Sequence, residues 1–255
     1  MEASEPGVRI APLAPAPPLL RRDQALFLDF DGTLVEIAPS PDLVQVPAEL
    51  PHLLGQLTDR LDGAVAVVSG RPLDELARLL APFAGGIAGA HGLERRSGDG
   101  NVMRCPVPAE LDRFRLLVAG FAARHDGLLF EDKGGILALH YRQAPSLGPR
   151  CRALIQRAAQ TSNGALAAVP GKMVIELISR SGGKGRAISN FLADPPFRRR
   201  LPVFIGDDTT DEDGFAVVNR LGGVSVHVGG GASIARYSLA AVGDVLAWLA
   251  TGLAE

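Results

Sequence analysis

The feature that most constrains this chain is a short apolar run that ends abruptly in two carboxylates and a turn. The run Leu26–Leu28 leads directly into Asp29-Phe30-Asp31-Gly32-Thr33. A short apolar run bounded by a turn predicts a buried strand, and open parallel sheets bind ligands beyond the carboxyl ends of their strands. Two unpaired carboxylates there would cost several kcal/mol unless a cation or hydrogen-bond donors accompany them. The run therefore predicts a metal-dependent site for an anionic substrate, with one aspartate free to act as nucleophile. The alternative is a turn whose aspartates bond the nearby backbone.

Composition excludes several classes of protein. A hydrophobic content of 47% and a charged content of 21% are typical of a globular chain. The net charge of −2 offers no basic face for nucleic acid, and no stretch reaches the roughly 18 apolar residues that span a membrane. Cys105 and Cys151 lack metal-binding spacing, which favours free thiols in a cytoplasmic protein. We expect neither a nucleic-acid nor a membrane partner, and we expect a monomer.

Strands and helices alternate along most of the chain. The first 22 residues hold five prolines and no hydrophobic period, which predicts a flexible proline-rich arm over 1–22. The alternation that follows predicts an α/β fold with a doubly wound parallel sheet. We expect strands at 25–30, 64–68, 86–90, 202–205 and 224–228, a hairpin around 98–100, and helices at 48–61, after Pro72, after Lys184, after Asp211 and at 242–253.

The stretch 105–179 breaks this alternation. Its pattern predicts helices at 109–124 and 149–161 and strands at 128–133, 135–142, 166–169 and 172–179. We interpret it as an α/β cap domain with its own antiparallel sheet, inserted into a core formed by 23–104 and 180–255.

Period-two alternation separates two faces of the sheet expected in the insert. One face is apolar and can cover the two helices. The other carries six polar side chains, namely Glu131, Lys133, His140, Arg142, Lys172 and Glu176. A solvated face is the ordinary explanation, but acids, bases and a histidine opposite a carboxylate site favour a surface that binds a polyol.

Reactive groups follow several core elements. Beside Asp29 and Asp31, Ser69-Gly70-Arg71 follows the strand 64–68, Lys184 opens a helix after two glycines, and Gly206–Asp213 follows the strand 202–205. Each could be a helix cap, a first-turn acid or a solvated charge. Together they suit phosphoryl transfer, in which carboxylates hold Mg²⁺ and a hydroxyl and an ammonium neutralise the phosphoryl oxygens.

These segments resemble, in order, the four motifs of the haloacid-dehalogenase-like (HAD-like) phosphatases. The resemblance to trehalose-6-phosphate phosphatases goes further and covers nearly everything from Ala25 onward. It is carried by Ala90–Glu94, Phe130–Lys133, His140–Arg142, Gly171-Lys172 with Glu176, and Gly206–Phe215. The resemblance implies a HAD-like, Rossmannoid core with an inserted cap that recognises sugar.

The resemblance also implies a role for each residue. Asp29 would be the nucleophile, forming an aspartyl-phosphate, and Asp31 the general acid and then base. Mg²⁺ would bind the Asp29 carboxylate, the Asp31 backbone carbonyl and Asp207, with Asp208 or Asp211 in support. Ser69 and Lys184 would hold the phosphoryl group. Substrate contacts would come from Ser69, Gly70, Arg71, His91, Glu131, Lys133, His140, Arg142, Lys172 and Glu176.

The implied activity is hydrolysis of trehalose 6-phosphate to trehalose and phosphate, the final step of trehalose biosynthesis. One alternative is a related phosphatase for another phosphosugar. A second is a non-catalytic, regulatory domain that binds sugar phosphate. Such domains usually lose the nucleophile or the metal-binding acids, whereas Asp29, Asp31, Lys184 and Asp207 are all present here.

Overall fold

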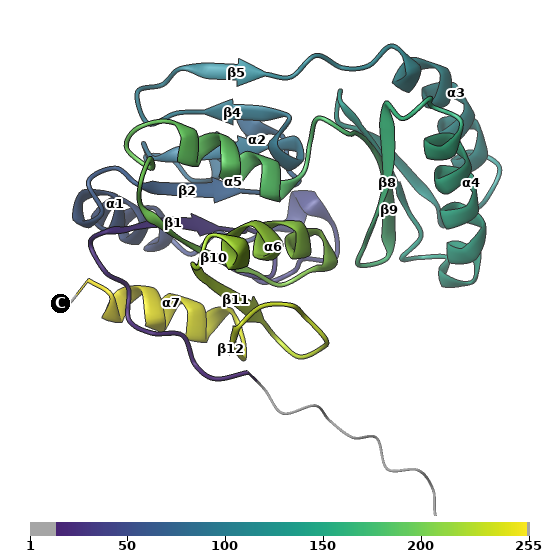
Figure 1. Ribbon diagram of the computed structural model, residues 1–255. Coiled ribbons are helices and arrows are strands. Elements are labelled where there is room, and N and C mark those ends of the chain that lie inside the picture. The colour runs from purple at the N-terminus through teal and green to yellow at the C-terminus, as the bar shows by residue number, and fades with distance from the viewer. Residues whose placement is uncertain (1–13, 254–255) are drawn as a thin grey trace, which may run out of the picture.

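One eight-stranded sheet carries the larger part of the structure, a computed structural model that describes residues 14–253 (Figure 1). Its strands are β1 (Gln24–Leu28), β2 (Val65–Val68), β3 (Gly86–Gly89), β4 (Glu94–Arg96), β5 (Val102–Arg104), β10 (Leu201–Gly206), β11 (Val224–Val228) and β12 (Tyr237–Leu239). They follow the order β12-β11-β10-β1-β2-β3-β4-β5. The strands from β12 to β3 pair in parallel, and the β4–β5 hairpin adds two antiparallel strands at one edge.

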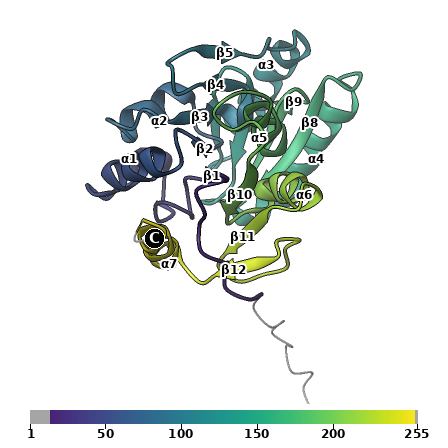
Figure 2. The same cartoon turned by 60° about the vertical axis from the view of Figure 1, so that its left-hand side comes forward.

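Helices cover both faces of this sheet. Figure 2 shows α1 (Leu50–Arg60) and α7 (Val242–Thr251) on one face and α5 (Lys184–Ala193) and α6 (Glu212–Arg220) on the other. The helix α2 (Leu73–Leu79) packs against β3 and β4. Because both faces are covered, all five residues of β1 are buried and the strand is continuously apolar after its first residue. The predicted doubly wound α/β core is confirmed.

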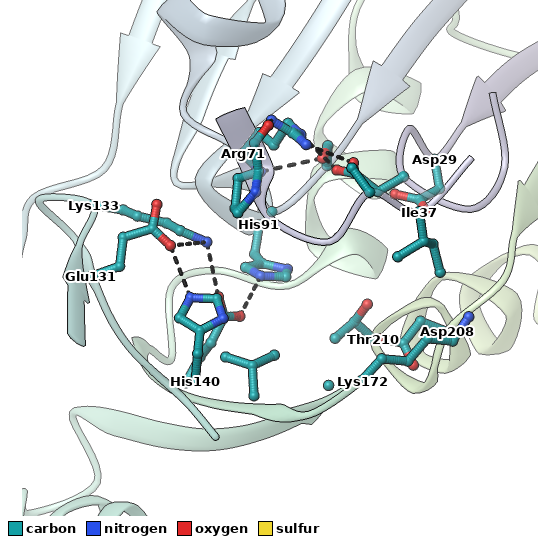
Figure 3. Close-up of a pocket in the computed structure, with 18 of the residues that line it drawn as sticks. Asp29, Ile37, Arg71, His91, Glu131, Lys133, His140, Lys172, Asp208 and Thr210 are labelled. Atoms are coloured by element: carbon teal, nitrogen blue, oxygen red, sulfur yellow. Dashed lines mark hydrogen bonds and ion pairs between the residues drawn. The ribbon is translucent and has the colours of Figure 1, made fainter. Parts of the chain in front are cut away.

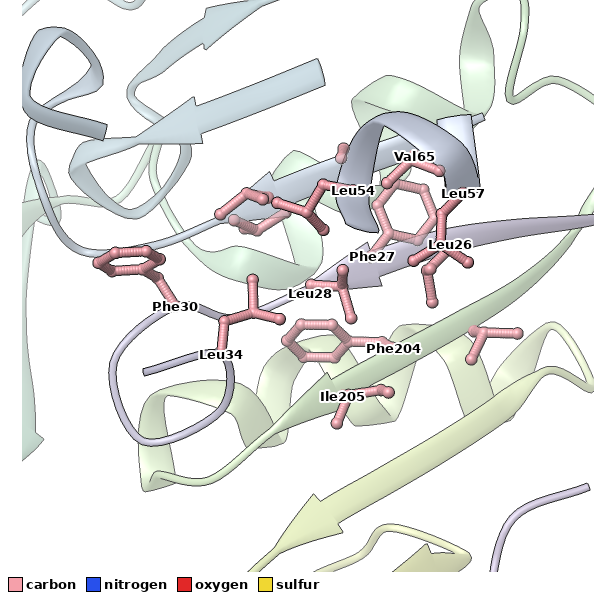
Figure 4. Close-up of a cluster of buried hydrophobic side chains, with 14 of the residues drawn as sticks. Leu26, Phe27, Leu28, Phe30, Leu34, Leu54, Leu57, Val65, Phe204 and Ile205 are labelled. Carbon is pink, nitrogen blue, oxygen red and sulfur yellow. The ribbon is translucent and has the colours of Figure 1, made fainter. Parts of the chain in front are cut away.

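Side chains of β1 lie at the centre of the core (Figure 4). The Phe27 ring lies 5.4 Å from that of Phe197 and 6.1 Å from that of Phe191, which belongs to α5. Leu26 and Leu28 alternate with Phe27 and therefore point to the opposite face of the sheet. The strand that leads into Asp29 is thus held by apolar contacts on both sides.

A second, four-stranded antiparallel sheet stands beside the core (Figure 1). Its strands are β6 (Leu129–Asp132), β7 (Ile136–His140), β8 (Leu166–Gly171) and β9 (Val174–Ser179), in the order β6-β7-β9-β8. The helices α3 (Glu110–Ala122) and α4 (Gly148–Gln160) pack on one face. Leu137, Leu139, Ile175 and Leu177 form a hydrophobic cluster with these helices, so the predicted apolar face is confirmed. We call this unit the cap.

Residues 14–253 also form four short 3₁₀ helices: η1 (Pro41–Leu43), η2 (Ala90–Gly92), η3 (Pro145–Leu147) and η4 (Thr209–Asp211). Both cysteines are free. Within residues 14–253, no helix has the length and apolar character needed to cross a bilayer.

The structure departs from the expected elements in three places. The edge strand β12 was not predicted, because three residues make no recognisable apolar run. Lys172 and Met173 form the turn between β8 and β9 instead of opening a strand. The flexible arm predicted for 1–22 is wrong for its second part, while 1–13 lie outside the described residues. Leu20 is buried in the core, and Ser238 donates hydrogen bonds to the carbonyls of Ala14 and Pro15, since proline-rich backbone still offers acceptors.

We expect Phe27→Ala to lower the free energy of unfolding by about 3–5 kcal/mol, because it leaves a cavity between two other rings. Urea denaturation followed by the fluorescence of Trp248, the single tryptophan, measures this loss, since Trp248 packs against the same core. Leu116→Ala is the matched control: that side chain is 83% exposed, so the change should stay within about 0.5 kcal/mol. Equal losses in the two variants would contradict the assignment of Phe27 to the core.

Candidate active site

Three carboxylates meet at the carboxyl edge of the core sheet. Asp29 follows β1 and Asp207 follows β10, and these strands are parallel neighbours. Asp211 ends η4. One oxygen from each of these buried carboxylates lies within 4.8 Å of the others. Distant segments of the chain therefore converge because adjacent parallel strands end at the same edge.

Lys184 lies between two of these acids. It is the first residue of α5, and its Nζ lies 2.6 Å from Asp29 Oδ1 and 2.6 Å from Asp211 Oδ1. Its side chain is only 4% exposed. Burial disfavours the charged form, but the carboxylates of Asp211 and Asp29 outweigh burial and raise the pKa of Lys184. The ammonium is therefore a fixed positive charge beside Asp29.

The cluster holds more negative than positive charge. Three carboxylates face the ammonium of Lys184 and that of Lys172, which pairs with Asp207 Oδ2. Burial raises the pKa of Asp29 well above its ordinary value, and Asp211 raises it further, whereas Lys184 lowers it. Asp207 Oδ1 is buried and has no hydrogen-bond donor in the part of the chain that the structure describes. Oxygen ligands with an excess of negative charge fit a hard divalent cation such as Mg²⁺.

Two local features hold Asp207 in place. Asp211 Oδ2 accepts hydrogen bonds from the backbone N–H groups of Asp207, at 3.1 Å, and Asp208, at 3.0 Å. Both oxygens of Asp211 are thus engaged, so Asp211 supports the cluster from behind. Gly32, with φ +84°, lies against the Asp207 carboxylate, where a Cβ would come within 2.2 Å of an oxygen. Only glycine allows this approach.

Asp31 is held by an arginine. Arg71 donates from Nε to Asp31 Oδ2 at 2.7 Å and from Nη2 to Asp31 Oδ1 at 2.8 Å. Its Nη1 donates to Glu75 and, at 3.0 Å, to the Pro41 carbonyl. This two-bond geometry fixes the orientation of the Asp31 carboxylate. Four of the five N–H donors of Arg71 are engaged by protein groups, and one N–H of Nη2 is left beside the pocket. The expected contact of Arg71 with substrate stays a prediction.

Ser69 and Gly70 connect β2 to this arrangement. Ser69 is buried, and its Oγ accepts a hydrogen bond from the Arg71 N–H at 3.2 Å. A Cβ on Gly70 would come within 2.5 Å of the His91 ring. The backbone of Ala90, His91 and Gly92 takes three successive positive φ angles, of 48°, 52° and 86°. Such a conformation is strained for Ala90 and His91. The ring of His91 lines the pocket.

The cap presents its charges as balanced pairs. Glu176 lies 2.7 Å from His91 Nε2 and 3.1 Å from Lys133 Nζ. Glu131 lies 3.0 Å from His140 and 3.6 Å from Lys133. Burial works to raise the pKa of Glu176, but His91 and Lys133 outweigh it and lower the pKa below its ordinary range. Figure 3 shows Glu131, Lys133 and His140 across the pocket from Asp29 and Arg71.

A single pocket of about 210 Å³ brings both sets together. Every residue that the sequence proposed for the site lines it except Asp211, which is fully buried behind Asp207. Sequence reasoning missed the loop 37–41 and Glu75, which also line the pocket. The spacing of Glu75 four residues after Arg71 could have indicated their pairing. The loop 37–41 carried no comparable signal.

The chain is similar in sequence to known phosphatases. The family model described as trehalose-phosphatase matches residues 27–241. The trehalose-6-phosphate phosphatase of Escherichia coli K12 is 44% identical over 233 residues, which cover 91% of this chain and 87% of that protein. A probable trehalose-phosphate phosphatase of Sinorhizobium fredii is 43% identical, covering 80% of this chain and 77% of its own length.

A solved structure shares the fold. The C-terminal domain of trehalose-6-phosphate phosphatase from C. albicans matches with a TM-score of 0.82 and 21% identity, covering 97% of this chain and 99% of that one. The acids, the buried lysine, the cap and these likenesses together lead to one conclusion: the chain belongs to the trehalose-phosphatase family.

Proposed function

We propose that this protein hydrolyses trehalose 6-phosphate to trehalose and inorganic phosphate, the last step of trehalose synthesis. The observation that carries the proposal is the pocket itself, in which Asp29, Lys184 and Asp207 face the polar side of the cap. The family and the E. coli relative support the substrate. They do not favour another phosphosugar or a regulatory role without catalysis.

The first half of the reaction transfers the phosphoryl group to Asp29. An oxygen of Asp29 attacks phosphorus, the bond from phosphorus to the sugar oxygen breaks, and Asp31 gives that oxygen its proton. Lys184 and Ser69 hold the phosphoryl oxygens and neutralise their charge. Arg71 positions Asp31 in this scheme through its paired hydrogen bonds, and one N–H of its Nη2 remains for the substrate.

The second half releases phosphate. Asp31, now ionised, takes a proton from water as the water oxygen attacks phosphorus, and the bond from phosphorus to Asp29 breaks. The Asp29 carboxylate, the Asp31 backbone carbonyl and Asp207 would hold Mg²⁺, which would supply positive charge to a site that has too little of it. Asp208 and Asp211 support this set. Asp208 accepts the Thr209 N–H at 2.8 Å, and Asp211 holds the loop that carries Asp207.

The cap recognises the sugar. Glu131, Lys133 and Glu176 are paired with one another and with histidines, so they offer donors and acceptors at fixed positions with little excess charge. Neutral sugar hydroxyls need such partners. Arg142, His140 and Lys172 line the same wall, and the cap also limits access of water to the pocket.

We expect the chelator-treated protein to release phosphate from trehalose 6-phosphate only after Mg²⁺ is added, because the carboxylates of the acidic cluster outnumber the ammonium groups that face them. Colorimetric phosphate release measures this across a panel of trehalose 6-phosphate, sucrose 6-phosphate, glucose 6-phosphate and mannosylglycerate phosphate. Absence of hydrolysis of every ester with Mg²⁺ present would remove the catalytic proposal. Preference for another ester would replace only the substrate.

We expect Asp29→Asn to lower kcat by about 10⁴-fold or more, because an amide oxygen is a poor nucleophile, while substrate binding persists. Phosphate release gives the rate, and calorimetry with trehalose 6-phosphate gives the binding. Asp99→Asn, in the exposed turn of the β4–β5 hairpin, is the matched control and should leave the rate unchanged. Near-normal turnover in Asp29→Asn would assign the nucleophile to another residue.

We expect Glu131→Ala to lower kcat/KM for trehalose 6-phosphate by about tenfold to a hundredfold, the cost of losing hydrogen bonds to a charged group. The rate with p-nitrophenyl phosphate should fall far less, because that ester has no sugar to contact the cap. Asp126→Ala removes an exposed cap acid outside the pocket and serves as the control. Equal losses of Glu131→Ala on both esters would show that Glu131 maintains the pocket and does not recognise sugar.

A further inference from the structure

Two lysines contact the acidic cluster, and they are held very differently. Lys184 is 4% exposed and lies between Asp29 and Asp211. Lys172 comes from the cap, where it opens the two-residue turn between β8 and β9. Its side chain is 48% exposed although it reaches Asp207, whose side chain is 5% exposed. The ammonium of Lys172 can therefore withdraw into solvent by side-chain rotation, whereas that of Lys184 cannot.

Charge balance separates the two lysines further. The carboxylates of Asp29, Asp207 and Asp211 carry three negative charges. Lys184 and one divalent cation balance these charges completely. Once such an ion is bound, the ammonium of Lys172 is one positive charge in excess, and it occupies Asp207 Oδ2, an oxygen of an expected ligand. Cation and ammonium therefore repel each other and compete for the same carboxylate.

The turn that carries Lys172 is also where the cap meets the core. Thr209 Oγ1, in η4, donates to the Pro170 carbonyl at 3.0 Å, and Glu176 of β9 reaches His91 of the core. The pair formed by Lys172 and Asp207 is a further polar contact of this hairpin with the core, beside the apolar contact of Ile178 with Ala90 and Leu93. Figure 3 shows Lys172 beside Asp208 and Thr210 of the core loop. Removing that pair weakens the attachment of the hairpin.

We propose that Lys172 is an internal counter-ion for the metal-binding acids, displaced from Asp207 when the divalent cation binds. The proposal rests on the proposed function in that it takes the metal to bind at Asp29 and Asp207. Metal binding and attachment of the β8–β9 turn then oppose each other. By thermodynamic reciprocity, cation binding weakens attachment of the turn, and attachment of the turn weakens cation binding by the same free energy.

The test compares cation binding to variants of the full chain without substrate. After chelator treatment and dialysis, calorimetry with Mg²⁺, and with Mn²⁺ by electron paramagnetic resonance, gives the dissociation constant. We expect Lys172→Met to bind about fivefold more tightly than wild type, the scale of a partly exposed ion pair. Lys172→Arg keeps the charge and should stay within about twofold of wild type.

Arg142→Gln is the matched control for the loss of a positive charge in the same pocket. Arg142 is exposed, and within residues 14–253 its side chain donates one hydrogen bond, to the Lys172 carbonyl at 3.4 Å. Glutamine keeps an N–H donor. Its cation affinity should also stay within about twofold of wild type. Unchanged or weaker binding in Lys172→Met, or equal tightening in Arg142→Gln, would overturn the role of Lys172 and leave the proposed hydrolysis untouched. Failure of both wild type and Lys172→Met to bind either cation would overturn the metal site as well.

Hydrogen exchange supplies a second, independent readout. Mg²⁺ should speed exchange of backbone amides around residues 170–174 in wild type, because it releases the turn from Asp207. Lys172→Met should exchange faster there without Mg²⁺ and respond little to it. Protection of these amides by Mg²⁺ in wild type would contradict the proposal, since it would mean that the cation and the turn reinforce each other.

Discussion

Crowding of negative charge at the carboxyl edge of the core sheet is the constraint on which the rest of the structure depends. The parallel pairing of β1 and β10 places Asp29 beside Asp207, and the apolar side chains around Phe27 prevent β1 from shifting to relieve the repulsion. Gly32 permits the close approach, and Lys184 makes it tolerable. The remaining excess of negative charge attracts a cation.

The two walls of the pocket differ in how their charges are arranged. On the core side, negative charge is in excess, and the carboxylates of Asp29 and Asp207 follow the ends of β1 and β10. On the cap side, Glu131 and Glu176 share Lys133, and each also pairs with a histidine. This division suits a substrate with a charged phosphate at one end and an uncharged sugar at the other. The pocket thus reflects the polarity of the ligand proposed for it.

Local patterns were enough to predict much of the fold and of the site. Apolar runs located the central strands, and period-two alternation separated the pocket-facing cap residues from the buried ones, because strand geometry leaves no other choice. The pairing of Arg71 with Asp31 could not be predicted, since it joins the loops that follow β1 and β2, which meet only in the folded chain. The same holds for the packing of Leu20 and the position of the loop 37–41. Lys172 was placed on the correct wall, but its contact with Asp207 depends on how the cap is seated on the core.

The separate hydrophobic cluster of the cap has a consequence for cooperativity. Leu137, Leu139 and Ile175 are buried among cap residues and share no contact with the core cluster around Phe27. Within residues 14–253, the apolar cluster between the two units is small and is formed by Ala90, Leu93, Ile136 and Ile178 with partly buried neighbours. Heat or denaturant can therefore melt one unit while the other remains folded. In such a half-folded molecule the acids of the core would stay assembled but lack the polar wall of the cap. Under the proposed function, discrimination between phosphate esters would then be lost before the capacity to cleave them.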